Sequence, residues 1–255
     1  MPNALITGAD RGFGLSLAKF LLEMNWTVYA GKFIEEYTLL EDLQKENDRL
    51  RIVWLDVGSK EAIQAAYEEI RRETDCLDML VSNAALMGKT GKDIPQTKKI
   101  MPHYEPKPVL AEGEKTDYEH VWRSYRVNAL GALTLTNVFL PMLERSELKR
   151  LCYVSSEVAS VNMMNRDRHV AYPMSKSALN MTVRMIHNDL FPKGYKIRLF
   201  HPGWMRRVML DGTRVEGAAI DPDESAVVAV RYFTEPLNDE HRLVMVDYLG
   251  NEWPF

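Results

Sequence analysis

The sequence predicts an α/β fold in which a doubly wound, mostly parallel sheet of about seven strands is flanked by helices. Short apolar runs alternate with helical patterns from one end of the chain to the other. A glycine-rich segment directly follows the first apolar run and opens the first helical pattern. No segment resembles a linker, so residues 1–255 are expected to form a single domain. Strands that alternate with helices require right-handed crossovers, and these give a parallel sheet that is covered on both faces.

Each expected element follows from its own pattern. Ser59 is the residue type that caps a helix, and we expect it to start the helix that ends near Arg72. The expected strands are residues 4–7, 27–30, 52–55, 77–81, 151–154, 197–200 and 243–246. The other expected helices are residues 15–22, 35–47, 117–143 and 171–190.

One segment interrupts this alternation. Residues 86–115 contain four prolines and six lysines and show no clear period. We therefore expect an inserted basic loop, and loops of this length are usually functional or disordered.

Composition excludes several classes of protein. The hydrophobic fraction of 46% is sufficient for a core, and the net charge of −4 without a concentrated basic stretch argues against a nucleic-acid binder. The most apolar stretch, Ala129–Leu143, is too short to span a membrane. Two cysteines and six histidines show no metal-binding spacing, so no metal is predicted. With no visible secretory signal, we expect a cytoplasmic protein.

The glycine-rich segment reads Thr7-Gly8-Ala9-Asp10-Arg11-Gly12-Phe13-Gly14. Glycines between a strand and a helix let the backbone approach a pyrophosphate, and the helix N-terminus favours the negative charge. The spacing G-x-x-x-G-x-G differs from the dinucleotide fingerprint, so an ordinary strand-to-helix turn is the alternative. The residues expected to contact a nucleotide are Gly8, Asp10, Arg11, Gly12, Phe13 and Gly14.

A phenol and an ammonium lie four residues apart in Tyr172-Pro173-Met174-Ser175-Lys176. Positions i and i+4 share one face of a helix, so both side chains can address one substrate. A nearby cation favours the phenolate, which suits a general acid and base. An exposed helix face is the alternative, because such a pair is common by chance.

These motifs resemble the short-chain dehydrogenase/reductase family, and the closest motifs are those of C-factor and sniffer-type carbonyl reductases. The resemblance covers almost the whole chain, except the 86–115 insertion and about the last dozen residues. It implies a Rossmann-like domain in which Thr7, Gly8, Gly12 and Gly14 form the glycine motif. It also implies a catalytic tetrad, which is Asn128, Ser156, Tyr172 and Lys176.

Further cofactor contacts are implied by the resemblance. Asp56 and Val57 follow the third strand, where the family binds adenine. Asn83 and Ala84 match the motif after the fourth strand, although Ala85 replaces its glycine. Tyr172 and Lys176 also face the cofactor in the family. The turn after the sixth strand adds Pro202, Gly203 and Trp204.

The type of cofactor is predicted from charge. The second strand ends in Ala30-Gly31-Lys32 with no acidic residue, so Arg11 and Lys32 could together bind the 2′-phosphate of NADP(H). Two solvated surface cations are the alternative, and NAD(H) is the less favoured cofactor. Arg206 and Arg207 could attract an anionic group or could simply face solvent.

We therefore expect an oxidoreductase that transfers a hydride between NADP(H) and a small-molecule carbonyl or secondary alcohol, with Tyr172 as general acid and base. A non-catalytic NADP(H)-binding regulatory or interaction protein of the same fold is the alternative. Epimerisation of nucleotide sugars is disfavoured, because only about 50 residues follow the sixth strand. By analogy with the family, a homodimer or homotetramer is expected. No nucleic-acid or membrane partner is predicted.

Overall fold

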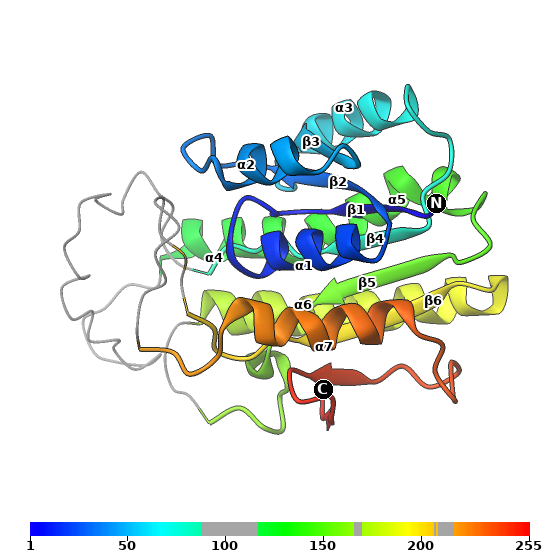
Figure 1. The fold of residues 1–255 in the computed structure, drawn as a ribbon. Coiled ribbons are helices and arrows are strands. Elements are labelled where there is room, and N and C mark those ends of the chain that lie inside the picture. The colour runs from blue at the N-terminus through cyan, green and yellow to red at the C-terminus, as the bar shows by residue number, and fades with distance from the viewer. Residues whose placement is uncertain (88–116, 166–169, 207, 209–216) are drawn as a thin grey trace.

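The structure is a computed structural model, and it describes residues 1–87, 117–165, 170–206, 208 and 217–255 (Figure 1). Its strands form one eight-stranded sheet in the order β3-β2-β1-β4-β5-β6-β7-β8. Neighbouring strands are parallel, except that β7 and β8 are antiparallel. The strands are β1 (Asn3–Ile6), β2 (Thr27–Lys32), β3 (Leu50–Trp54), β4 (Met79–Ser82), β5 (Arg150–Val154), β6 (Lys196–His201), β7 (Met245–Asp247) and β8 (Glu252–Trp253).

The doubly wound sheet predicted from the sequence is therefore confirmed, with one strand more than expected. The additional strand β8 has two residues, and it pairs Trp253 with Met245 of β7. A strand of two residues shows no alternation of apolar and polar residues, so no periodic pattern could predict it. The chain order reverses between β1 and β4, which makes a topological switch point at the carboxyl ends of these strands.

Helices cover both faces of the sheet (Figure 1). On one face a core cluster that includes Leu17 and Phe233 lies under three helices, α1 (Gly12–Glu23), α2 (Leu39–Glu46) and α7 (Pro222–Thr234). On the other face a cluster that includes Phe139 and Val183 lies under α3 (Lys60–Arg71), α5 (Gly131–Leu143) and α6 (Ala171–Leu190), and α4 (Tyr118–Tyr125) packs on α6. Two short 3₁₀ helices are η2 (Glu157–Ala159) and η3 (Phe191–Lys193).

The long helix expected at 117–143 is divided in the structure. A π-helical turn, η1 (Arg126–Leu130), separates α4 from α5. Asp117 caps the start of α4 by accepting a hydrogen bond from the His120 amide at 3.0 Å. The predicted cap of α3 is confirmed, because the Ser59 hydroxyl accepts a hydrogen bond from the Ala62 amide at 3.2 Å.

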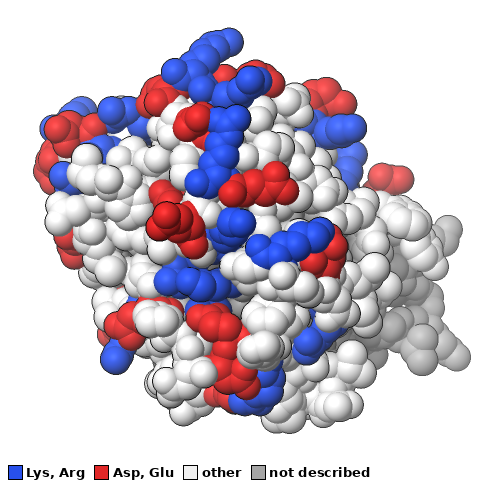
Figure 2. Space-filling view, turned by 90° about the vertical axis from the view of Figure 1, so that its right-hand side faces the viewer, with Lys and Arg blue, Asp and Glu red and all other residues white. Residues whose placement is uncertain are grey.

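Two surface properties bear on partners. Among the helices of the described ranges, none has the length and apolarity that a membrane crossing needs. Figure 2 shows the side of the molecule at which the strands begin, where basic and acidic side chains are intermixed. That face therefore carries no large field of one sign.

Candidate active site

The predicted site residues gather where the strands end, at the left of Figure 1. The glycine loop follows β1, and Lys32 is the last residue of β2. This edge of an open α/β sheet is the one at which ligands bind. Further along the same edge, Asp56 follows β3, Asn83 follows β4, Ser156 follows β5 and Pro202 follows β6.

The glycine loop has the shape and charge that an anion requires. Gly8 and Gly12 adopt positive φ angles of 62° and 55°, which other residues rarely adopt. A Cβ atom on Gly14 would lie 2.2 Å from the carbonyl oxygen of Gly8. The N-cap residue Arg11 gives no side-chain cap to α1, and the first turn holds no acidic residue. The N–H groups of that turn are thus left to a ligand, so these residues fit a pyrophosphate.

The loop is held from β4 by side-chain hydrogen bonds. The Thr7 hydroxyl accepts from the amides of Asn83 and Ala84 at 3.0 and 2.9 Å. The side-chain amide of Asn83 donates to the carbonyls of Thr7 and Gly8, both at 2.9 Å. Asn83 and Ala84 therefore fix the position of the loop in the structure.

Two residues of the loop turn their side chains toward the protein. The Asp10 carboxylate is buried and accepts from the amides of Phe33 and Ile34 at 2.6 and 3.2 Å. Burial raises the pKa of Asp10 above its ordinary value, although these hydrogen bonds act to lower it. The Phe13 ring stacks on Phe200 at a centroid distance of 5.9 Å within the core. Asp10 thus ties the segment after β2 to the glycine loop.

The two basic residues of the expected phosphate clamp both have partners within the protein. The Arg11 guanidinium lies 5.1 Å from the centroid of the Tyr37 ring. Lys32 donates from Nζ to Glu41 Oε1 at 2.5 Å, and its side chain is only 13% exposed. Glu41 lies in the first turn of α2, and the sequence analysis did not identify it. A 2′-phosphate at Lys32 would therefore meet a cation that is already paired with a carboxylate.

Asp56 and Val57 lie between β3 and α3. Asp56 Oδ1 accepts from the Gly58 amide at 2.8 Å, which closes a local turn. Val57 is buried, and a Cβ atom on Gly131 would lie 2.5 Å from the Val57 carbonyl oxygen. Because Gly131, the first residue of α5, has no side chain, the start of α5 can lie close to this turn.

Asn128 lies in the π-helical turn and is 2% exposed. Its side chain pairs with both backbone groups of Leu86, at 2.7 Å to the amide and 2.9 Å to the carbonyl. It also donates to the Ser175 hydroxyl at 2.8 Å, and that hydroxyl donates to the Tyr172 carbonyl at 2.7 Å. The extra residue of a π turn and these contacts together turn Asn128 toward α6. Ser175, which the sequence analysis did not single out, links Asn128 to Tyr172.

Lys176 and Tyr172 share one face near the start of α6. Lys176 is 2% exposed, and its Nζ lies 5.8 Å from the centroid of the Tyr172 ring. Nζ donates to the Val154 carbonyl at 2.8 Å, so the ammonium is anchored to the end of β5. Burial lowers the pKa of Lys176 to about 7, because the charged form loses its hydration.

The two serines after β5 differ in their surroundings. Ser155 is buried and donates to Asn180 Oδ1 of α6 at 2.6 Å, so its hydroxyl is used in holding α6 to the end of β5. Ser156 is partly exposed and has extended backbone angles at the N-cap of η2. This arrangement leaves Ser156 as the serine on the open side of the sheet edge.

The turn after β6 is tightly packed except for its tryptophan. Gly203 has a φ of 79°, and a Cβ atom there would lie 2.3 Å from Ile220. The buried Pro202 accepts through its carbonyl from the Ser225 hydroxyl at 2.9 Å. Trp204 is 69% exposed, so its ring is not packed into the turn.

Of the two arginines that follow this turn, the structure describes the contacts of Arg206 only. Arg206 donates to the Ala218 carbonyl at 3.3 Å and lies 3.8 Å from the Asp221 carboxylate, so its guanidinium forms an ion pair within the protein. Arg207 and most of the 86–115 insertion lie outside the described residues. In the part of the chain that the structure describes, no group of three or more potential metal ligands occurs.

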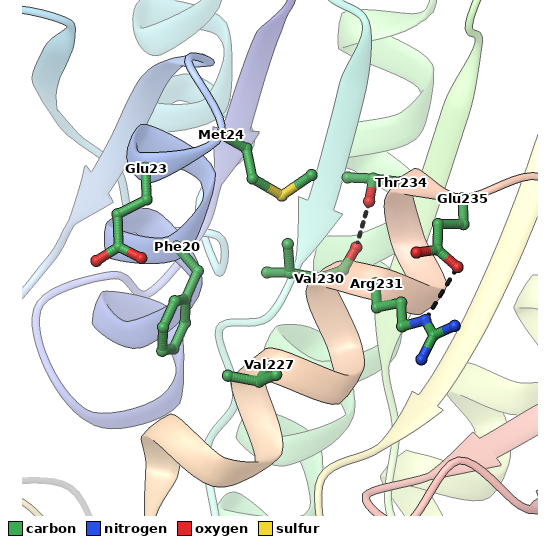
Figure 3. A pocket seen from close by; sticks show the side chains of 8 residues that line it. All are labelled: Phe20, Glu23, Met24, Val227, Val230, Arg231, Thr234 and Glu235. Carbon is green, nitrogen blue, oxygen red and sulfur yellow. Dashed lines mark hydrogen bonds and ion pairs between the residues drawn. The ribbon is translucent and has the colours of Figure 1, made fainter.

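A pocket of about 310 Å³ lies away from this edge, between the C-terminal halves of α1 and α7 (Figure 3). Phe20 and Val227 line its apolar part, while Arg231 at its rim is paired with Glu235 at 3.0 Å. It is at the opposite end of α1 from the glycine loop, and none of the predicted site residues line it.

The comparison with protein families decides the affiliation. The model of the short chain dehydrogenase family matches residues 2–216. The chain belongs to this family. It is also 36% identical over 140 residues to the C-signal of Myxococcus xanthus, and these residues are 54% of this chain and 81% of that protein.

Solved structures share the fold of this chain. The carbonyl reductase Sniffer of D. melanogaster has a TM-score of 0.80 at 23% identity and covers 100% of both chains. The NADPH-bound carbonyl reductase from chicken fatty liver has a TM-score of 0.78 at 23% identity and covers 100% of this chain and 99% of that one. The predicted resemblance to short-chain dehydrogenases of the C-factor and sniffer type is confirmed. This family member is accordingly an oxidoreductase with a Rossmann-like fold.

Proposed function

We propose that this short-chain dehydrogenase interconverts a carbonyl and a secondary alcohol with NADP(H), and that Tyr172 is its general acid and base. The observation that carries the proposal is the buried Lys176 beside Tyr172 on α6, which is anchored to Val154 at the end of β5, two residues before Ser156. A pure scaffold has no physical reason to bury an ammonium, because desolvation of the charge is costly.

Each residue of the tetrad has a distinct task in this mechanism. In the direction of reduction, the phenol of Tyr172 donates its proton to the carbonyl oxygen as negative charge develops there. The Ser156 hydroxyl donates a hydrogen bond to the same oxygen, which stabilises that charge. Lys176 supplies positive charge beside the phenol and so favours the phenolate that remains. Asn128 holds this part of α6 through Ser175.

The cofactor supplies or takes up the hydride when it is bound. The glycine loop, with the uncapped N-terminus of α1, would hold the pyrophosphate. Asp56, Val57, Asn83 and Ala84 line the adjoining strand ends, and Pro202, Gly203 and Trp204 form the turn on the nicotinamide side.

The preference for NADP(H) over NAD(H) rests on Arg11 and Lys32. Both are cationic and flank the end of β2, where β2 itself carries no acidic residue. The pairing of Lys32 with Glu41 reduces the advantage that this cation can offer. We therefore propose that Arg11 carries the larger share of the preference.

We also propose a homodimer or homotetramer, formed through α4 and α6. Large apolar side chains are exposed along these neighbouring helices, and exposed apolar patches of this kind mark interfaces. The assembly is testable by sedimentation equilibrium, with Met181→Lys combined with Met185→Lys expected to yield a monomer. The exposed side chains are Tyr118, Trp122, Met174, Met181 and Met185.

The first experiment is calorimetric titration of the purified protein with NADPH and with NADH, followed by turnover on a panel of aldehydes and ketones. We expect NADPH to bind more tightly than NADH, and Tyr172→Phe to abolish turnover while cofactor affinity is retained. Tighter binding of NADH would contradict the role of Arg11 and Lys32 only. Turnover that Tyr172→Phe leaves unchanged, or a folded protein that binds neither cofactor, would contradict the proposed function.

A further inference from the structure

The last residue of β6, His201, connects two turns of the candidate site through a single atom. Its side chain is almost completely buried, at 3% exposure. The ring nitrogen Nδ1 accepts a hydrogen bond from the Glu157 amide at 3.2 Å and another from the Gly203 amide at 3.2 Å. The first amide directly follows Ser156, and the second belongs to the turn on the proposed nicotinamide side.

Aromatic contacts from the C-terminal part of the chain fix the orientation of this ring. Tyr248 meets the His201 ring edge to face at a centroid distance of 6.1 Å, and Trp253 of β8 does so at 5.4 Å. Because Nδ1 accepts two hydrogen bonds, the neutral ring must carry its proton on Nε2. That nitrogen lies 3.9 Å from the Glu157 carboxylate.

We propose that His201 is a positioning residue, which sets the distance between the turn of Ser156 and the turn of Gly203. Without a shared acceptor, the two amides would have no side chain to hold them together, and the two turns could move independently. The consequence for turnover rests on the proposed function, because Ser156 is expected to bind the reacting oxygen there. The structural coupling itself does not depend on which reaction is catalysed.

Protonation would abolish this coupling, since a charged imidazole has no acceptor nitrogen. The groups that face the ring are the carboxylates of Glu157 and Asp247 and the phenol ring of Tyr248. Burial lowers the pKa of His201, and the two carboxylates raise it by less. The ring therefore stays neutral at neutral pH, and protonation breaks the coupling only at a pH below the ordinary histidine pKa of about 6.5, because the pKa of the buried ring is lowered.

Two variants separate the acceptor from the mere presence of a side chain. His201→Asn can place an amide oxygen near the position of Nδ1 and does not titrate, whereas His201→Leu fills space without an acceptor. The matched control is His187→Leu, because His187 is also buried but lies at the far end of α6.

The first measurement uses the protein without cofactor. In ¹H–¹⁵N spectra we expect the Glu157 and Gly203 amides to shift in His201→Leu, to stay near their wild-type positions in His201→Asn and to be unaffected in His187→Leu. The imidazole ¹⁵N signals of the wild type should report a proton on Nε2. Unshifted amides in His201→Leu, or a proton on Nδ1, would overturn the proposal whatever the activity of the protein.

The second measurement is turnover and NADPH affinity. We expect His201→Leu to lower kcat by about tenfold to a hundredfold, because displaced reacting groups cost rates of this order, and to leave NADPH affinity nearly unchanged. His201→Asn should recover most of kcat and remove the loss of activity that protonation of His201 causes at acidic pH. A folded His201→Asn protein as impaired as His201→Leu would overturn the proposal. Absence of wild-type turnover would count against the proposed function, and the amide shifts would then decide on His201.

Discussion

Burial of Lys176 should make the stability of this protein depend strongly on pH. Its side chain is 2% exposed, and burial lowers its pKa from an ordinary 10.5 to about 7. Below about pH 7 the folded and unfolded states both hold the proton. Between about pH 7 and 10.5 the unfolded chain keeps the proton that the folded protein has lost. The unfolded state therefore binds more protons in this window, and stability must rise with pH.

The size of the effect follows from the gap between the two pKa values. That gap is about 3.5 units, and each unit corresponds to about 1.4 kcal/mol. The contribution of Lys176 to the free energy of unfolding should thus rise by about 5 kcal/mol across the window. Since the group is buried, solvent screening does not reduce this value appreciably. At neutral pH nearly the whole desolvation cost is still present, so the native lysine destabilises the fold there.

The assay is urea unfolding of wild type and Lys176→Met at steps from about pH 6.5 to 10.5. The quantity of interest is the difference in unfolding free energy between the two proteins, which removes groups common to both. Burial raises the pKa of Cys152 to about 12, and its titration cancels in this difference. Lys193→Met is the matched control, because Lys193 is exposed and paired with Asp189 on the surface.

We expect Lys176→Met to be at least as stable as wild type near pH 7, and wild type to gain about 1.4 kcal/mol per pH unit relative to it. The difference in unfolding free energy between wild type and Lys193→Met should not change with pH. Parallel curves for wild type and Lys176→Met would refute the depressed pKa of the lysine. Turnover should be lost in Lys176→Met at the lower end of this range, where the wild-type lysine carries its positive charge beside the phenol.

Three further substitutions test other contacts. Glu41→Gln removes the anion beside Lys32. In calorimetric titrations we expect it to tighten NADPH binding about fivefold and to leave NADH binding unchanged. An unaltered ratio of NADPH to NADH affinity would contradict the effect of the Lys32–Glu41 pair on the cofactor. The buried Arg198 contacts the Glu240 carboxylate through two nitrogens, and Glu240→Gln removes the negative charge of that group. We expect this substitution to lower the free energy of unfolding by about 3 kcal/mol. A loss smaller than the error of urea titration would contradict a stabilising role of this ion pair. Asn128→Leu leaves the amide and carbonyl of Leu86 unpaired, so we expect about 2 kcal/mol of destabilisation in thermal unfolding and reduced turnover. Wild-type stability and wild-type turnover together would contradict the proposed role of Asn128.

The sheet was predictable because its strands are buried on both faces and therefore appear as continuous apolar runs. The site edge followed from the same pattern, since the glycine loop, Asp56, Asn83, Ser156 and Pro202 each follow such a run. Ser59 could be assigned as a cap for a similar reason, because its effect is local to one turn. These predictions depend on residues that are close together in the sequence.

Contacts between separate helices, strands and loops were not predictable in this way. The pairing of Lys32 with Glu41 depends on how α2 lies beside the end of β2, which the sequence pattern does not encode. The π turn at Asn128 arises from hydrogen bonds to Leu86, a residue 42 positions away. A single extra residue in a helical turn hardly alters apolar periodicity, so the segment appeared as a continuous helix.

The polar side chains at this edge have a common structural origin. Parallel strands end with backbone groups that no neighbouring strand can pair, and an unpaired buried group is costly. Here side chains supply the partners: Thr7 for Asn83 and Ala84, Lys176 for Val154, and His201 for Gly203. A side chain that stabilises a strand end is held in one orientation by the same contact.

It follows that two kinds of substitution should behave differently at this edge. Removal of Thr7 or His201 takes away a neutral partner of backbone amides, so stability and positioning should fall together. Removal of Lys176 takes away one carbonyl contact but also a buried charge, so stability should hold or rise while turnover falls. This opposite sign distinguishes a group retained for its chemistry from one retained for the fold. Stability measurements on the three variants, made without any substrate, can therefore test where the reaction chemistry of this protein lies.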